Sequence, residues 1–195
     1  MISDLKLKPH ATSFTLCLPD TDAIAVELPL LGKHSAENVA LAALLAREMG
    51  LTGEEIARGI EGIRPVPHRL QLIEGDGVYI LDDSYNANPR GAREAVEALK
   101  RFPARKIVVT PGLVETGILD EKLNGELGAA LVGLDEVILV GETLVGAVKA
   151  GYLEAGGEEE KIVVLPTLDA AQARLSETLS AGDCVLFLND LPDAW

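Results

Sequence analysis

VYILDDSYNANPRGAREAVEALK, residues 78–100, joins a hydrophobic strand to a helix through a loop of carboxylates and amides. The apolar run at its start is typical of a buried strand, and Pro89 suits the first turn of a helix, where its missing N–H would have no partner. Four polar side chains lie where the strand hands over to the helix: Asp82, Asp83, Asn86 and Asn88. The stretch therefore predicts a strand-loop-helix unit with a polar loop at the carboxyl end of the strand.

The alternation of strand and helix continues through the rest of the chain. Strand-like runs occur at KIVVT, EVILVG, KIVVLP and CVLFLN, and helical stretches are expected to start near Pro89, Asp120, Thr143 and Leu168. Short continuous apolar strands separated by helices indicate a mostly parallel sheet that is covered on both faces. We therefore predict an α/β domain with a Rossmann-like, doubly wound sheet, which binds ligands beyond the carboxyl ends of its strands.

Residues 1–64 have a different pattern, which is typical of a small α+β unit. β-prone runs around a Pro-Asp-Thr-Asp turn predict a hairpin over residues 12–30. A strongly apolar helix is expected over residues 35–49, with Ser35 as its N-cap and Gly50 just past its end.

A second short helix is predicted after it, because Thr52 and Glu55 have the spacing of a capping box. The segment RPVPHR, residues 64–69, then stops helix formation, since each proline removes a donor and restricts the residue before it. We place a domain boundary near Pro65, which gives domains of residues 1–64 and 65–195.

Composition limits the classes of partner. The chain has 195 residues, of which 48% are hydrophobic, and a formal net charge of −14. This charge repels phosphate backbones and anionic lipids, so nucleic acids and membrane surfaces are poor candidates. No apolar run approaches the roughly 20 residues of a membrane span, and the first residues do not resemble a signal peptide, which predicts a cytoplasmic protein. Cys17 and Cys184 lack the spacing of a metal site and are predicted to be buried free thiols.

The loop DDSYNANP, residues 82–89, has two interpretations. Aspartate and asparagine are good turn and capping residues, so turn chemistry alone explains much of it. However, two adjacent carboxylates repel each other unless a cation or hydrogen-bond donors neutralise them, and four polar side chains exceed what one helix cap requires. Both a turn and a binding site remain open on these residues alone.

Three segments carry a resemblance to a known family: LLGKHSAENVALAALLA, RPVPHRLQLIEGDGVYILDDSYNANP and NDLPDAW. In this order they resemble successive landmarks of the Mur ligase superfamily, in particular the MurF type or a MurF-like paralogue. Folylpolyglutamate synthases typically have a DGAHNP-like sequence at the loop, and the MurE and cyanophycin types a DYAH-like one. The resemblance implies that residues 1–64 are the end of a central ATP-binding domain and residues 65–195 a C-terminal domain.

The same resemblance implies an ATP-dependent amide ligase of peptidoglycan precursor synthesis. Such enzymes convert a carboxylate of a UDP-muramoyl peptide to an acyl phosphate, which the amine of D-alanyl-D-alanine or a related substrate attacks. ATP and Mg²⁺ are the cofactors that it implies for the complete enzyme. Because no G-x-x-x-x-G-K-[ST] phosphate-binding sequence occurs in this chain, we expect that it is a partial ligase and inactive alone.

Site residues follow from the resemblance by position. Asn38 matches an asparagine that contacts adenine, Arg69 an arginine that reaches the nucleotide, and Asp83 an aspartate on the ribose side. Residues Ser84, Tyr85, Asn86 and Asn88 are implied to line the substrate cleft. No catalytic residue and no metal ligand is assigned, and structural roles are favoured for His34 and His68.

Two departures from the family pattern concern specificity. Ser35 replaces the first asparagine of a common H-N-x-x-N pattern, and VVTPGLVETG stands where MurF sequences usually have a GDM-E-LG run. The second change removes an aspartate and adds Pro111, which leaves the amino substrate open between D-alanyl-D-alanine and another amine.

Two other functions are weighed against the ligase. The first is a non-catalytic Rossmann-like module that uses the strand-end loop to hold a ligand or a protein. A nucleotide-dependent oxidoreductase ranks below it, since no G-x-G-x-x-G follows a strand. Because residues 1–64 would lack the rest of their sheet, we also expect dimerisation or partial disorder there.

Overall fold

The computed structural model describes residues 1–188 and divides the chain into two compact units, Met1–Val66 and a second that begins at Pro67. The NDLPDAW segment, residues 189–195, which contributes to the family resemblance, lies outside the described residues. No helix within residues 1–188 is long and apolar enough to cross a membrane.

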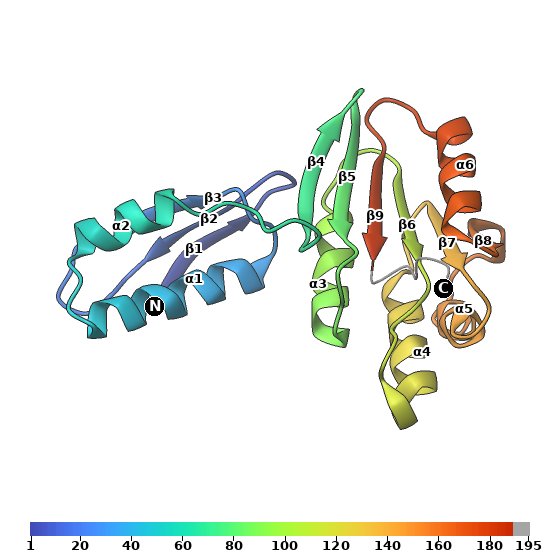
Figure 1. The fold of residues 1–195 in the computed structure, drawn as a ribbon, viewed down its shortest axis with the longest axis horizontal. Coiled ribbons are helices and arrows are strands. Elements are labelled where there is room, and N and C mark those ends of the chain that lie inside the picture. The colour runs from blue at the N-terminus through green and yellow to red at the C-terminus, as the bar shows by residue number, and fades with distance from the viewer. Residues whose placement is uncertain (189–195) are drawn as a thin grey trace. The chain divides into compact units, whose positions relative to one another are not determined.

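The first unit is a three-stranded antiparallel sheet with two helices packed against it (Figure 1). Its strands pair in the order β1-β2-β3, and its core includes Phe14, Leu16, Val26 and Leu28 from the sheet. The bounds are β1 Ile2–Leu7, β2 Thr12–Leu16, β3 Ile24–Leu28, α1 Lys33–Glu48 and α2 Gly53–Glu61. The predicted hairpin is confirmed by the pairing of β2 with β3, whereas β1 was not predicted.

Helix caps in this unit agree with the sequence at one position and differ at another. The predicted capping box is present, because the Thr52 hydroxyl accepts from the Glu55 N–H while the Glu55 carboxylate accepts from the Thr52 N–H. The prediction of Ser35 as the N-cap of α1 was wrong. The helix begins two residues earlier, after Gly32 with φ 86°, and Ser35 Oγ donates to the Leu31 carbonyl 2.7 Å away.

Apolar side chains remain exposed on α1 and at its C-cap: Leu41, Leu44, Leu45 and Met49. The expected dimerisation through this unit stays a prediction. The prediction that both thiols are buried was wrong for Cys17, which follows β2 on the surface. Cys184 is buried, and burial raises the pKa of its thiol to about 12, so it stays a thiol at neutral pH.

The second unit is a six-stranded sheet in the order β4-β5-β9-β6-β7-β8 (Figure 1). Within residues 1–188, β4 pairs with β5 in the antiparallel sense and the other pairs of this sheet are parallel, which confirms the predicted mostly parallel α/β sheet. The strands are β4 Gln71–Gly75, β5 Val78–Asp83, β6 Lys106–Thr110, β7 Glu136–Val140, β8 Ile162–Leu165 and β9 Cys184–Leu188. The helices are α3 Pro89–Leu99, α4 Asp120–Ala130, α5 Val145–Glu154 and α6 Leu168–Thr178, with short 3₁₀ turns at Gly117–Leu119 and Glu159–Lys161.

The central strands of this sheet are buried on both faces. Helix α6 packs on one face, where Ala171 and Leu175 meet Ile107, Val109 and Val185. Successive side chains of a strand point to opposite faces, and the intervening residues of β6 and β9 are fully buried as well. Among the other helices, α3 packs against β5 and β9, and α4 packs against α3 and α5. Because β5, β9 and β6 are parallel, the loops that follow β5 and β6 lie at the same edge of the sheet.

Candidate functional site

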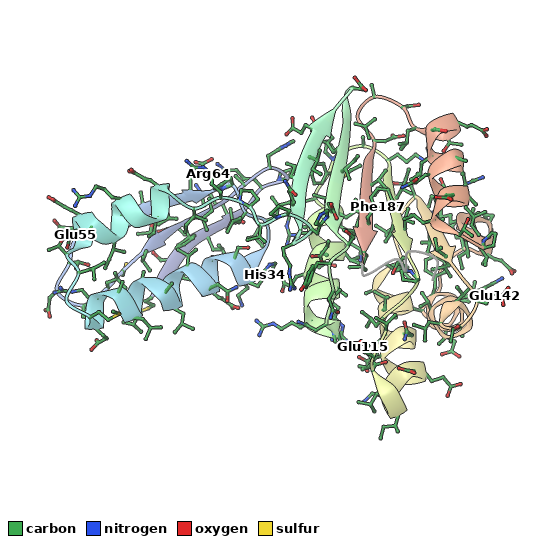
Figure 2. The ribbon with its side chains drawn as sticks, in the orientation of Figure 1. His34, Glu55, Arg64, Glu115, Glu142 and Phe187 are labelled. Atoms are coloured by element: carbon green, nitrogen blue, oxygen red, sulfur yellow. The ribbon has the colours of Figure 1, made fainter. Side chains whose placement is uncertain are left out.

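Strand β5 brings Asp82 and Asp83 to the carboxyl edge of the sheet. The two residues pair in register with Phe187, labelled in Figure 2, and Leu188 of β9. Because neighbouring side chains of a strand point to opposite faces, the two carboxylates diverge and each finds its own donors. The charge of Asp82 nevertheless remains one of the causes that raise the pKa of the Asp83 carboxyl.

Asp83 holds the backbone of the preceding turn. Its Oδ1 accepts a hydrogen bond from the Leu70 N–H at 2.9 Å, and the residue is only 9% exposed. Burial raises the pKa of this carboxyl to about 6, although the Leu70 N–H and the charge of Arg69 both favour the ionised form. Asp83 therefore titrates close to the neutral range.

Titration of Asp83 should make folding stability depend on pH. Its pKa is raised from 3.8 to about 6, so between these values the folded state binds more protons than the unfolded state, and stability falls as pH rises. At roughly 1.4 kcal/mol per pKa unit, the full component is about 3 kcal/mol. Urea unfolding from pH 4 to pH 7 should show this loss in the wild type and not in Asp83→Asn. Asp76→Asn, in the exposed β4–β5 turn, is the control; an unchanged profile in Asp83→Asn would contradict the assignment.

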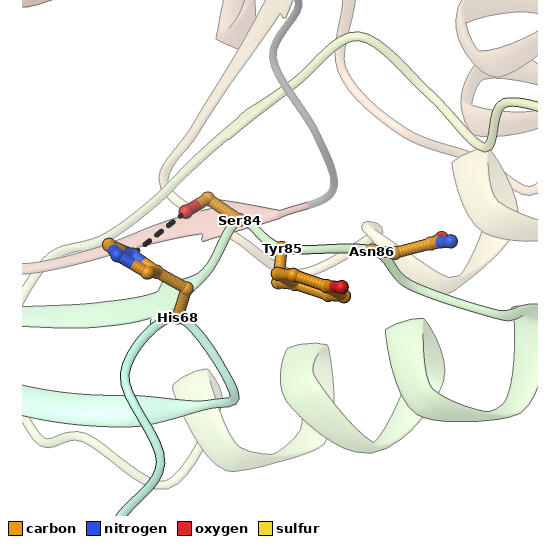
Figure 3. A pocket seen from close by; sticks show the side chains of 4 residues that line it. All are labelled: His68, Ser84, Tyr85 and Asn86. Atoms are coloured by element: carbon orange, nitrogen blue, oxygen red, sulfur yellow. Dashed lines mark hydrogen bonds between the residues drawn. The ribbon is translucent and has the colours of Figure 1, made fainter.

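Asp82 joins a histidine and a serine at the surface. Its Oδ2 lies 2.8 Å from His68 Nδ1, and its Oδ1 accepts from Ser84 Oγ at 2.6 Å and from the Ser84 N–H at 3.2 Å. His68 and Ser84 line an open pocket of about 480 Å³ together with Tyr85 and Asn86. Figure 3 shows the His68 ring and the Ser84 hydroxyl turned toward each other, with 3.5 Å between Nδ1 and Oγ.

Arg69 lies against the loop that follows β5. Its guanidinium carbon is 4.2 Å from the centre of the Tyr85 ring, and Nη1 donates to the Asn86 carbonyl at 3.4 Å. Both side chains of the stacked pair are on the surface, with Tyr85 62% exposed. A guanidinium supported on an aromatic face can complement phosphate charge while the ring supplies a flat apolar surface.

Of the remaining predicted residues, Asn88 caps helix α3. Its Oδ1 accepts from the Arg90 and Gly91 N–H groups at 3.1 and 2.9 Å, so turn chemistry accounts for this side chain. Asn86 is exposed and lines the pocket. Asn38 lies on the exposed side of α1 in the first unit. The structure thus groups Arg69 with residues 83–86, and the predicted nucleotide and substrate roles of all these residues stay predictions.

From the sequence, His68 was set aside as structural and Asp82 was noted at the strand end without an assigned role, although both contribute to this site. A signal for them exists in GDG, residues 75–77, because Asp-Gly between two strand-like runs predicts a tight hairpin. That hairpin pairs Gln71 with Asp82, and its register continued by three residues brings His68 to Tyr85. The Tyr85 N–H indeed donates to the His68 carbonyl at 3.2 Å.

A second loop, Pro111–Thr116, follows β6 at the same edge of the sheet and includes Glu115, labelled in Figure 2. The buried Asn124 of α4 holds it, since its Oδ1 accepts from the Leu113 N–H at 2.7 Å and its Nδ2 donates to the Leu113 carbonyl at 3.0 Å. Gly112 has φ 99°, and a Cβ there would also collide with the Asn124 amide oxygen. The start of the segment that departs from the MurF pattern is therefore specifically packed against α4.

Comparison with known proteins identifies the family. The model described as "Mur ligase, glutamate ligase domain" matches residues 68–189, a range that contains every residue lining the pocket. The chain belongs to the Mur ligase family. This Mur ligase chain is 34% identical to the UDP-N-acetylmuramoyl-tripeptide–D-alanyl-D-alanine ligase of Escherichia coli over 143 residues, which cover 72% of the chain and 31% of that protein.

Two further relatives agree. The ligase of the same name from Bacillus subtilis is 30% identical over 165 residues, covering 82% of this Mur ligase chain and 36% of that protein. The crystal structure of MurF from Thermotoga maritima in complex with ADP superimposes with a TM-score of 0.82 at 25% identity, over 97% of this chain and 42% of that one. The chain spans about a third of the length of the curated relatives.

Proposed function

We propose that this chain is the C-terminal part of an ATP-dependent amide ligase of MurF type that acts in peptidoglycan precursor synthesis. The observation that carries the proposal is the polar pocket of His68, Ser84, Tyr85 and Asn86 at the carboxyl edge of the sheet, within the region that matches the Mur ligase family. In the reaction, a UDP-muramoyl peptide supplies the acyl phosphate, and D-alanyl-D-alanine or a related amine attacks it. We propose a cytoplasmic location, as this substrate class implies.

The donors in this unit suit a nucleotide. Arg69 offers a guanidinium for phosphate oxygens, Tyr85 an exposed ring, and Asn86 an uncharged amide. We assign ATP contacts to Arg69 and Asp83, and to Asn38 in the first unit, with Ser84, Tyr85, Asn86 and Asn88 on the substrate side. Bound ATP would supply the phosphoryl group that activates the carboxylate.

We assign no magnesium ligand to this chain. Among residues 1–188 there is no group of three His, Cys, Asp or Glu side chains that could hold a metal ion. Because the sequence also contains no phosphate-binding G-x-x-x-x-G-K-[ST], we propose that these 195 residues alone neither hydrolyse ATP nor ligate. Magnesium-dependent ATP cleavage by the purified chain, retained through successive purification steps, would refute this.

The ligase proposal is tested with protein expressed from its complete reading frame, supplied with ATP, Mg²⁺, a UDP-muramoyl tripeptide and D-alanyl-D-alanine. Product should form, and Arg69→Lys should lower kcat/KM for ATP by about 100-fold, because lysine keeps the charge but loses the fork of donors and the stack on Tyr85. Arg101→Lys is the matched control, since Arg101 follows the far end of α3 and its guanidinium donates to the Glu97 carbonyl of that helix.

Three outcomes separate the possibilities. Product formation with the predicted loss supports the MurF reaction. Activity only with another amine would direct attention to the Pro111–Thr116 loop and sink the choice of D-alanyl-D-alanine. If no amine is ligated and ATP is not consumed, the chain is a non-catalytic binding module and the ligase proposal fails.

A further inference from the structure

Two residues that line the pocket, His68 and Ser84, are joined through Asp82 into a hydrogen-bonded trio. Asp82 is the middle member, with His68 on one carboxylate oxygen and Ser84 on the other. In a hydrolytic triad the histidine stands in the middle and takes the serine proton. Here the Ser84 hydroxyl donates to Asp82 instead, so Ser84 is not activated as a nucleophile. Its effect is to hold the Asp82 carboxylate toward the histidine.

The order of the trio determines which nitrogen of His68 is available. An ionised carboxylate only accepts hydrogen bonds, so the proton between Asp82 and His68 belongs to Nδ1. A neutral imidazole carries one proton, which leaves a lone pair on Nε2. The His68 side chain is 59% exposed, whereas that of Asp82 is 15% exposed. The ring therefore presents a proton-accepting edge on the side away from Asp82.

The turn that carries His68 is tied to the end of β5 and the loop after it. His68 and Leu70 have φ of 62° and 47°, in the left-handed region that non-glycine residues rarely adopt. The turn is kept there by two ties to the end of β5 and its loop: Tyr85 N–H to the His68 carbonyl at 3.2 Å, and Leu70 N–H to Asp83 Oδ1 at 2.9 Å. Strained backbone that surrounding bonds hold in place is a feature of functional sites.

We propose that His68 Nε2 accepts a proton from the amino group of the incoming substrate, with Asp82 and Ser84 as positioning residues. This inference rests on the proposed amide ligation. The ammonium group of the substrate gives one proton to Nε2, and the nitrogen lone pair so released attacks the carbonyl carbon of the acyl phosphate. The C–N bond forms as the C–O bond to phosphate breaks. Phosphate leaves with that electron pair and takes the second nitrogen proton, and the imidazolium returns its proton to water.

Three ionisable side chains of the described residues are relevant to the ring. Asp82 contacts it from β5, Arg69 follows it in the turn, and Tyr85 lines the same pocket. The Asp82 carboxylate stabilises the imidazolium that forms when Nε2 takes the proton. A positioned histidine base contributes about 100-fold to 10,000-fold to rate, which sets the size of effect to look for.

The decisive variant is His68→Asn in protein from the complete reading frame. Asparagine tolerates positive φ and its amide can still donate to Asp82, but it has no group in place of Nε2. We expect kcat to fall at least about 100-fold with little change in KM for the amine. The remaining rate should rise about tenfold per pH unit up to the amine pKa near 8, whereas the wild type levels off earlier. His68→Gly should be partly rescued by free imidazole, and His10→Asn, in the first unit, should behave as wild type.

A second measurement needs no catalysis. Imidazole ¹⁵N shifts in the 195-residue chain, which contains only three histidines, should show His68 as the Nδ1–H tautomer, and Asp82→Asn should abolish that preference. An Nε2–H tautomer in the wild type overturns the inference. A wild-type enzyme that ligates while His68→Asn keeps its kcat and pH profile overturns it as well. A wild-type protein that ligates no amine overturns the proposed function, and the proton-transfer role with it, whatever the tautomer.

Discussion

Replacement of Gly151 by alanine is expected to destabilise the second unit by at least about 3 kcal/mol, at the upper end of the usual cost of overpacking. Helices α4 and α5 cross with their backbones in contact, and a methyl group at Gly151 would overlap the backbone of Gly125. The obstacle is a carbonyl group within a helix, which cannot rotate away as a side chain would. Gly128 meets the Val148 carbonyl in the same way.

The matched control lies in the same helix. A Cβ at Gly146 meets nothing, so Gly146→Ala should stabilise α5 by about 0.5–1 kcal/mol through its better helix propensity. Urea unfolding of both variants measures the difference. If Gly151→Ala were as stable as the wild type, the close crossing of α4 and α5 would be wrong, and with it the position of Asn124, through which α4 holds the Pro111–Thr116 loop.

The second large effect is expected at the edge of the sheet opposite the pocket, where Arg105→Met should lower the free energy of unfolding by about 3 kcal/mol. The Arg105 guanidinium pairs with Glu136 through Nη2 and lies 3.5 Å from Asp183 Oδ2, and these two carboxylate side chains are only 6% and 8% exposed. Methionine keeps the length of the side chain but leaves both carboxylates with less compensation. Breaking a buried pair from the better solvated side is the more damaging choice, because the desolvated charges remain.

Arg105 also donates to the Thr178 carbonyl at 3.0 Å, so it ties the end of α6 to the sheet. Arg101→Met is the surface control and should change stability by less than about 0.5 kcal/mol. The double variant Arg105→Met with Glu136→Gln should recover part of the loss, because it removes one buried charge. Arg174 Nε, which donates to Glu136 at 2.7 Å, can donate to the glutamine oxygen instead. Equal stabilities of Arg105→Met and Arg101→Met in urea would show that the buried carboxylates do not depend on Arg105.

Much of the site was accessible from the sequence because it follows directly from one strand-loop-helix unit. Ser84, Tyr85 and Asn86 were predicted at the strand end and line the pocket. For Asn88 the sequence left a turn and a binding site equally open, and the structure shows its side chain capping helix α3. His68 was set aside as structural because a histidine beside prolines has no local pattern that distinguishes a base from a surface residue.

What the sequence by itself determined are the local features: the apolar strands, the helix starts at Thr52 and Pro89, and the polar loop between β5 and α3. These depend on neighbours within a few residues, where propensity and capping act. Only the tertiary structure decided that β9 lies between β5 and β6, and that His68 meets a carboxylate 14 positions away. Strand order and hairpin register depend on which distant surfaces pack together, and the free energy of that packing is not written in any one segment.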